Sequence, residues 1–132
     1  MHLRTAKRLA EKYFKKCEEI YGYSKFYETT PYLDFEKSIY SRYSGINAYD
    51  TACEEDDTPE AEYDFIHNVI VIYYRNIKDA KHLAQTIIHE YQHYLQSPTW
   101  MTRYYNMGHC YSDHPYEIAA YKEEENYKMI IE

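Results

Sequence analysis

Two histidines and a glutamate, His89, Glu90 and His93, stand together in the pattern His-Glu-Tyr-Gln-His, which is an HExxH motif. Residues four apart on an α-helix lie on nearly the same face, so both histidines can offer a ring nitrogen to one metal ion. Glu90 lies about 100° further round such a helix, within reach of a water on that metal. The motif predicts Zn²⁺ held by the histidines, with Glu90 as general base acting on a zinc-bound water.

With 7 histidines in 132 residues, the motif arises in roughly 4% of shuffled chains. The interpretation as a metal site therefore depends also on the segments around the motif. Residues 65–74 are rich in β-branched and aromatic side chains, which predicts a strand covered on both faces. The motif then lies in an expected helix from Asp79, its N-cap, to Ser97, with Pro98 ending it. The apolar side chains of this helix share one arc, and the histidines form a separate stripe that faces away from the core.

A catalytic zinc site needs a third protein ligand, and the downstream candidates are Glu117, His109 and His114. Glu117 falls in the first turn of an expected helix that begins at His114-Pro115, and the small Ala120 one turn later allows close approach to the motif helix. The alternative role for Glu117 is a capping box, in which its carboxylate accepts a hydrogen bond from the backbone N–H of His114. We expect Glu117 as the ligand and His109 as the next candidate.

The segment 98–113 between the two helices is rich in aromatic residues. We expect it to be a long connection that folds over the histidine stripe. It also supplies groups that can stabilise a tetrahedral oxyanion, namely Tyr111 and His109, and His114 follows directly after it. The choice among these three stays open at the level of the sequence.

The remaining elements predict an α+β fold. An amphipathic helix is expected over residues 3–21, closed by Gly22. Short strands are expected at 32–35 and 43–49, and the acidic segment 53–62 is expected to be a solvated loop. Together with the motif helix and a C-terminal helix that carries Glu117, they predict a small, mainly antiparallel sheet in a minimal zincin-like domain.

Composition limits the function classes. A chain of 132 residues suits one domain, and a net charge of −7 argues against general affinity for nucleic acid or anionic membranes. Cys17, Cys53 and Cys110 show no pairing pattern, which is typical of a reducing compartment. The N-terminus lacks the apolar stretch of a signal peptide, and no apolar run reaches transmembrane length. We therefore expect an intracellular, cytoplasmic protein with a protein or peptide substrate.

The HExxH motif, paired with the sequence His-Pro-Tyr-Glu-Ile-Ala-Ala at 114–120, resembles the zincin metallopeptidases. Within them it resembles the small gluzincins, in which a downstream glutamate is the third zinc ligand, and short zincin-like proteins encoded by phages. The resemblance covers roughly residues 65–128. It implies a hydrolase with zinc on His89, His93 and Glu117, and a substrate paired with the strand at 68–73.

The chain departs from the relatives of this group at several positions. Tyr121 stands where thermolysin-like enzymes have an acidic residue four positions after the ligand glutamate, and Glu124 is the available substitute. Gln96 and Thr99 occupy positions where metzincins require glycine and histidine. An SprT-like arrangement with His109 as third ligand stays open. So do two non-enzymatic alternatives, a zincin-fold metal-binding protein that acts in partner recognition and an interaction protein without metal.

Overall fold

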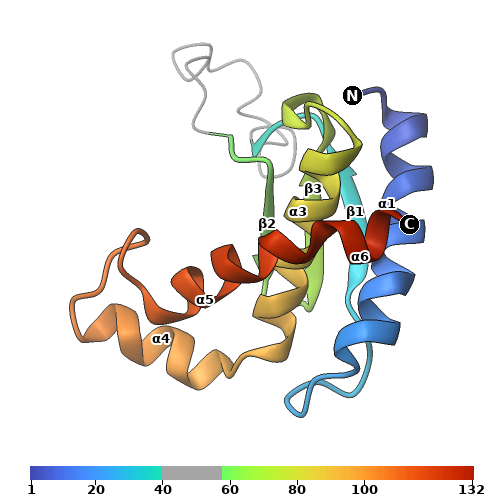
Figure 1. The fold of residues 1–132 in the computed structure, drawn as a ribbon. Helices are drawn as coiled ribbons and strands as arrows, with labels where there is room; N and C mark the ends of the chain where they lie inside the picture. Colours follow the sequence, from blue (N-terminus) through green and yellow to red (C-terminus); the bar gives the residue numbers. More distant parts are fainter. Residues whose placement is uncertain (40–57) are drawn as a thin grey trace, which may run out of the picture.

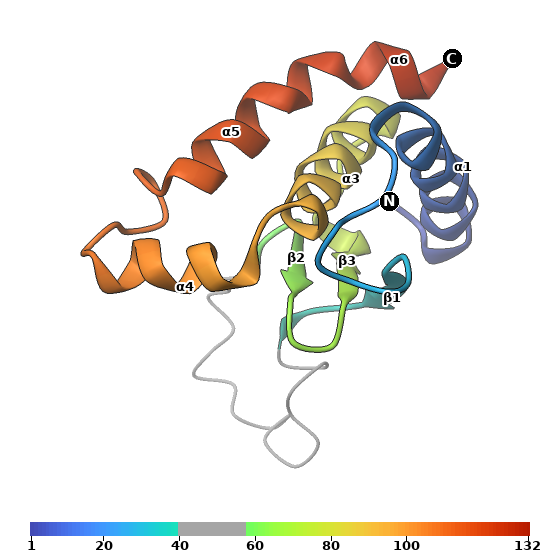
Figure 2. The same cartoon turned by 90° about the horizontal axis from the view of Figure 1, so that it is seen from below.

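The computed structural model describes residues 1–39 and 58–132, in which two layers of helices lie over one face of a small sheet (Figures 1 and 2). The fold is therefore α+β, as the sequence predicted. The strand expected at 43–49 and most of the acidic segment lie outside the described residues.

The sheet is centred on β3 (Val69–Tyr73), with β1 (Tyr32–Glu36) parallel to it on one side and β2 (Ala61–Asp64) antiparallel on the other. The central position of β3 follows from its composition, because Ile70 to Tyr73 are completely buried. The expectation of a mainly antiparallel sheet was wrong. The chain leaves β1 at one edge of β3 and enters β2 at the other, so β3 is inserted between them and one of its two pairings is parallel.

A tight turn joins β2 to β3. The carboxylate of Asp64 accepts hydrogen bonds from the backbone N–H groups of Ile66 and His67, both at 3.0 Å, and Asn68 has a positive φ of 55°. Asparagine tolerates this left-handed conformation better than most residues. The strand expected from Phe65 therefore begins only at Val69, and β2 occupies residues that were expected to be a loop.

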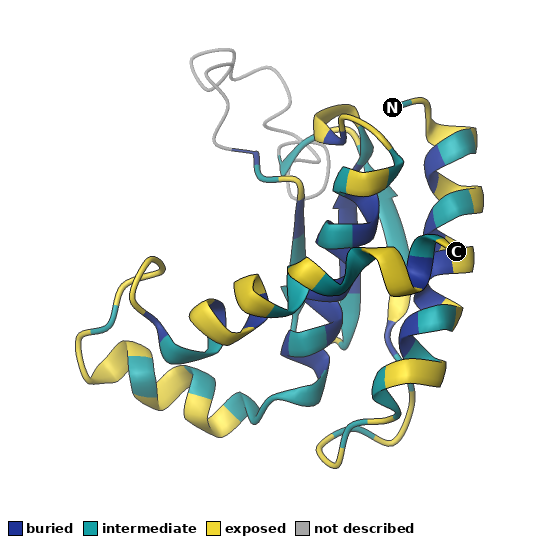
Figure 3. Ribbon diagram, in the orientation of Figure 1, coloured by how far each residue is buried: buried dark blue, intermediate teal, exposed yellow. Residues whose placement is uncertain are grey.

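The first layer of helices contains α1 (Leu3–Tyr21) and α3 (Ala80–Leu95). Helix α1 was predicted, including its end at Gly22, whose φ of 76° suits a residue without Cβ. Helix α3 begins where the side chain of Asp79 accepts the N–H of His82 at 2.8 Å. It packs against α1, β2 and the C-terminal helices, so it is buried along much of its length (Figure 3).

A separate helix, α4 (Pro98–Asn106), occupies much of the segment that was expected to be a long connection. Pro98 does not end α3, which stops at Leu95, but is the first residue of α4. Ser97 caps α4 by accepting the N–H of Trp100 at 3.3 Å. Proline suits the first helical position because its missing N–H has no partner there in any case.

The second layer of helices is formed by the C-terminal segment, which crosses over α3 (Figure 2). It consists of α5 (Pro115–Glu123), the 3-10 turn η4 (Glu124–Asn126) and α6 (Tyr127–Ile131). The start at His114-Pro115 was predicted, whereas the interruption at η4 was not. Its contacts with α3 cover the histidine stripe, so His89 and His93 are buried rather than exposed.

One hydrophobic core joins these layers. Ile70 and Ile72 of β3, Ile87 and Tyr91 of α3, and Ile130 of α6 belong to a single cluster of buried side chains. In the two ranges that the structure describes, no helix is both long and apolar enough to cross a lipid bilayer.

Candidate metal centre

The geometry of α3 brings the motif side chains together. His89, Glu90 and His93 are all buried, and one ligand atom from each lies within 4.8 Å of the others. The rings of the two histidines lie one turn apart, with centroids separated by 4.9 Å. The group could therefore hold a metal ion.

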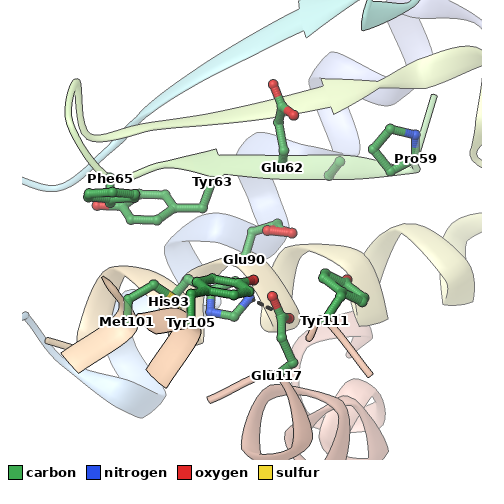
Figure 4. Close-up of a pocket in the computed structure, with 11 residues that line it drawn as sticks. Pro59, Glu62, Tyr63, Phe65, Glu90, His93, Met101, Tyr105, Tyr111 and Glu117 are labelled. Atoms are coloured by element: carbon green, nitrogen blue, oxygen red, sulfur yellow. Dashed lines mark hydrogen bonds and ion pairs between the residues drawn. The ribbon is translucent and has the colours of Figure 1, made fainter. Parts of the chain in front are cut away.

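Helix α5 adds a carboxylate to this group. Glu117 Oε1 lies 2.8 Å from His89 Nε2. It also lies 2.9 Å from His93 Nε2 (Figure 4). Ala120, one turn later, is completely buried, in keeping with the close approach predicted for α3 and α5. Helix α5 is capped by the ring of His114, whose Nδ1 accepts the N–H of Tyr116 at 3.1 Å, while Glu117 Oε1 is directed at the two histidines.

The outward nitrogens of both histidines are also occupied. His89 Nδ1 lies 2.8 Å from Glu124 Oε2, and His93 Nδ1 lies 2.7 Å from Gln96 Oε1. The amide of Gln96 is oriented by a second bond, which its Nε2 donates to the carbonyl of Tyr116 at 3.1 Å. Because a carboxylate and an amide oxygen can only accept, Nδ1 is the protonated nitrogen in both rings. The lone pairs of both Nε2 atoms then face Glu117 when the rings are neutral.

This arrangement fits a divalent metal. Two neutral imidazole Nε2 atoms and a carboxylate oxygen are all acceptors, so only a cation, either protons or a metal ion, can hold them together. Nitrogen and oxygen ligands of this kind are typical of zinc, and a tetrahedral zinc separates its ligands by about 3.3 Å. The distances of 2.8 and 2.9 Å to Glu117 would need to grow by only about 0.5 Å.

The pKa values of these side chains reflect the same convergence. Burial by itself would lower the pKa of His89, but its hydrogen bonds to Glu117 and Glu124 outweigh burial and raise the pKa to about 10. The pKa of His93 is raised by Glu117 in the same way, against the effect of burial. Burial would raise the pKa of Glu117, but the two histidines outweigh it and lower that pKa to about 2.

Glu90 differs from Glu117 in having an unsatisfied carboxylate oxygen. Glu90 is only 6% exposed, and its Oε2 has no hydrogen-bond partner among the described residues. Burial raises the pKa of this carboxyl, against the lowering effect of His93 and His89. Burying an acceptor without a hydrogen bond lowers the stability of the fold. Such an atom is typical of a site that binds a ligand or a water molecule.

A cavity of about 300 Å³ opens next to Glu90, between β2 on one side and α3, α4 and α5 on the other (Figure 4). Its lining includes His93 and Glu117, so it gives access to the centre. Tyr111, one of the predicted oxyanion-stabilising candidates, also lines it. Glu90, His93, Glu117 and Tyr111 are thus brought together around one open space.

Two other sequence candidates lie elsewhere. His109 does not line the cavity; its Nδ1 is 3.7 Å from Asp113 Oδ2 and its ring packs against Tyr104. His114 is completely buried, and its Nε2 donates to the carbonyl of Met101 at 3.1 Å. The geometry therefore favours Glu117 over both histidines as the third ligand, and it leaves neither histidine as an oxyanion-stabilising group.

Sequence reasoning missed two residues of the site. Gln96 entered the sequence argument only as a departure from metzincins, yet it orients His93. Tyr105 of α4 lines the cavity, and its pKa is raised by burial and by the charge of Glu117. The Ser97-Pro98 pair, a cap followed by a proline at the first helical position, was the signal that could have revealed α4 and this side chain.

The prediction that a substrate pairs with the strand at 68–73 was wrong. Residues 68–73 cannot take an additional strand, because β3 is paired with β1 on one side and with β2 on the other. The strand beside the cavity is β2, which is an edge strand of the described three-stranded sheet.

No protein-family profile, curated protein or solved structure matches this chain.

Proposed function

We propose that this chain is a zinc-dependent peptidase of the gluzincin type, in which His89, His93 and Glu117 hold the metal. One observation carries the proposal, namely the convergence of two imidazole Nε2 atoms and a carboxylate oxygen beside Glu90, whose Oε2 has no hydrogen-bond partner among the described residues. Zinc at this position supplies a Lewis acid and lowers the pKa of a coordinated water to about 7.

Glu90 acts as the general base. Its carboxylate accepts a proton from the attacking water and then passes it to the nitrogen of the leaving amine, so the carboxylate is regenerated at the end of each cycle. Burial raises the pKa of Glu90, which makes its carboxylate a stronger base than an exposed one. A water molecule also satisfies Glu90 Oε2, which has no partner among the described residues.

Two tyrosines of the cavity are the candidates for stabilising the oxyanion. Tyr111 and Tyr105 both line the cavity beside Glu117, and a phenolic hydroxyl can donate a hydrogen bond to a developing negative charge. Burial raises the pKa of both hydroxyls, which keeps them protonated at neutral pH.

An extended peptide would bind along β2. The edge of this strand is adjacent to the cavity, and addition of a strand gives main-chain hydrogen bonds that do not depend on the side chains of the substrate. The cavity also favours a peptidase over a protein that uses its metal only to recognise a partner, because such a protein does not require open space beside a base.

The test compares Glu90→Gln with Glu125→Gln, which removes the same charge from an exposed position in η4. We expect both purified variants to retain one equivalent of zinc. Glu90→Gln should lose peptide cleavage by about 10²–10⁴-fold, the usual contribution of a general base, while Glu125→Gln should cleave like the wild type. Unchanged cleavage in Glu90→Gln, or absence of zinc from the wild type, would overturn the proposal.

A further inference from the structure

We infer that a second, acidic cavity beside Glu90 binds the side chain of a lysine next to the scissile bond. This inference rests on the proposed function and names the substrate class of the same site. The substrate would be a peptide that carries a primary ammonium group on the side of the metal where His89 lies.

The second cavity has a volume of about 110 Å³ and a mainly polar lining. Three carboxylates border it, from Glu60 just before β2, Glu90 in α3 and Glu124 in η4. No lysine or arginine of the described ranges lines it. The other lining residues are Pro59, Ala61, His82, Thr86, His89, Tyr111 and Tyr121. The cavity is therefore a concentration of negative charge.

Hydrogen-bond donors of the lining are already directed at protein acceptors. The hydroxyl of Thr86 donates to the carbonyl of His82 at 2.7 Å, and His89 Nδ1 donates to Glu124 Oε2 at 2.8 Å. Glu90 Oε2, by contrast, is a buried acceptor without a partner among the described residues. An ammonium group has three N–H donors and no acceptor, so it supplies what the cavity lacks.

Bound zinc would not neutralise this cavity. The two charges of the ion are balanced by the carboxylates of Glu90 and Glu117, while the imidazoles that hold it are neutral. Glu60 and Glu124 then have no positive charge beside them in the lining. The side chain of Glu124 is only 22% exposed, so its attraction for a cation is weakly screened by solvent.

The ligand is an organic cation rather than a second metal ion. In residues 1–39 and 58–132, the one group of three potential ligands that lie within 4.8 Å of one another is His89, Glu90 and His93. The carboxylates of the second cavity are spread more widely, so a ligand must extend to reach them.

The size of the second cavity favours an unbranched chain. Its volume of about 110 Å³ is smaller than the roughly 150 Å³ of a cavity that accommodates benzene. Lysine has a flexible four-carbon stem that ends in a compact charge, which suits a narrow space with acidic walls.

The two cavities lie on opposite sides of the proposed metal. His93 lines the first cavity and His89 lines the second. Ala61 of β2 borders both, as do Glu90 and Tyr111. A peptide bound along β2 would therefore pass both cavities, and the lysine would lie on one side of the cleaved bond only.

The depth of the second cavity favours a side chain over a free N-terminal amine. Its lining follows two turns of α3 from Glu90 back to His82, which is about 12 Å. Glu60 marks the far end, because its Oε1 lies 3.7 Å from His82 Nε2. An α-amino group is attached to the carbon that carries the scissile carbonyl, so it would stay near Glu90, whereas a lysine ammonium can extend towards Glu60.

The first experiment is cleavage of a random peptide library with blocked termini by the zinc-loaded protein, with the cut sites read by mass spectrometry. We expect lysine to be enriched at one position adjacent to the cut. Glu60→Gln should lower kcat/KM for a lysine peptide about three- to tenfold, the effect of losing one partly exposed ion pair. The matching norleucine peptide, which keeps the four-carbon stem without the ammonium, should be cleaved as by the wild type. The matched control is Glu125→Gln in η4, which should leave both peptides unchanged.

A second measurement does not depend on cleavage. With zinc added to the wild-type protein, N-acetyl-lysine amide should shift the methyl NMR signal of Thr86, which lines the second cavity. The signal of Thr102, exposed on α4, should not move. N-acetyl-norleucine amide, which has no ammonium, and alanine amide, which has only an α-amine, should shift neither signal.

The possible results separate this inference from the peptidase proposal. Cleavage without a preference for lysine, or absence of the Thr86 shift, would overturn the inference and leave the peptidase proposal standing. A Thr86 shift with alanine amide but not with N-acetyl-lysine amide would assign the cavity to a free N-terminal amine and would also overturn it. A Thr86 shift with N-acetyl-lysine amide in a protein that holds zinc but cleaves no peptide would support the lysine site and overturn the peptidase proposal.

Discussion

At the scale of single residues, both ring nitrogens of His89 and of His93 have a partner, which fixes the orientation of the two rings for metal binding. Their Nε2 atoms face Glu117, and their Nδ1 atoms face Glu124 and Gln96 respectively. Each outer bond fixes both the tautomer and the plane of the ring. The Nε2 atoms are thus directed inwards before a metal arrives, so little rotational freedom of the rings remains to be lost on binding.

The first prediction concerns Gln96. We expect Gln96→Ala to weaken zinc binding by roughly 10–100-fold, because His93 loses the acceptor that orients its ring. Competition with a chromogenic chelator measures the affinity. Gln92→Ala is the matched control on the same helix, since the Gln92 Nε2 group has no partner among the described residues and no role at the histidines. Equal losses in the two variants would show that the His93–Gln96 bond does not contribute to binding.

The spacing of the motif was sufficient to predict the histidine pair, because helical periodicity is a local property. It was not sufficient to identify Gln96, which lies just beyond the end of α3 and reaches back to His93 only because the helix stops at Leu95. The choice between Glu117 and His109 likewise depended on how α5 crosses α3, which single-sequence patterns do not specify.

At the scale of elements, the start of α5 determines where Glu117 points. The ring of His114 caps the helix through Nδ1, and its Nε2–H donates to the carbonyl of Met101 in α4. One completely buried side chain therefore joins α4 to α5, three residues before Glu117. The position of the carboxylate and one wall of the cavity depend on the same contact.

The second prediction tests this contact. His114→Ala should lower the free energy of unfolding of the metal-free protein by at least about 1 kcal/mol, because it removes a helix cap and a buried hydrogen bond. It should also weaken zinc binding, since Glu117 is less well positioned. His114→Asn, which restores a capping side chain but not the bond to Met101, should recover part of the stability. Urea unfolding measures both variants, and wild-type stability in His114→Ala would contradict the proposed role.

Two elements of the fold were not predicted, for different reasons. Helix α4 carried recognisable start signals in Ser97 and Pro98, but Pro98 was assigned to the end of the preceding helix, so a connecting segment was predicted instead. Strand β2 carried no such signal, because its acidic residues have low strand propensity. It forms because Ala61 and Tyr63 face the helices and pack against the core, while the Glu62 carboxylate accepts a hydrogen bond from Tyr73.

At the scale of the whole molecule, the candidate metal centre lies where the sheet, α3 and the C-terminal helices meet (Figure 2). Without metal, this junction depends on an ion-paired cluster of His89, His93 and Glu117. The stability of the fold should therefore depend on the protonation of these groups, and the metal should change that dependence.

The third prediction is a pH profile for the metal-free protein. The pKa of Glu117 is lowered from 4.5 to about 2, so its contribution to stability is present above pH 4.5 and is lost as the pH falls through 2. The pKa of His89 is raised from 6.5 to about 10, so its contribution is present below pH 6.5 and is lost as the pH rises through 10. The raised pKa of Glu90 adds a loss that begins as the pH rises above 4.5, because ionisation of its buried carboxyl opposes folding. We expect stability to be maximal near pH 4.5 and to fall on both sides of it.

Zinc should reverse the alkaline loss, because it binds the neutral imidazoles and so binds more tightly as the pH rises. The increase in Tm caused by zinc, measured against protein in chelator, is expected to grow between pH 6 and pH 8. A free zinc concentration of about 100 times Kd should add about 2.7 kcal/mol to the free energy of unfolding. Glu125→Gln should show the same increase as the wild type, whereas Glu117→Ala should show little, because the third ligand is missing. Identical pH profiles with zinc and with chelator would mean that no metal is held by these side chains.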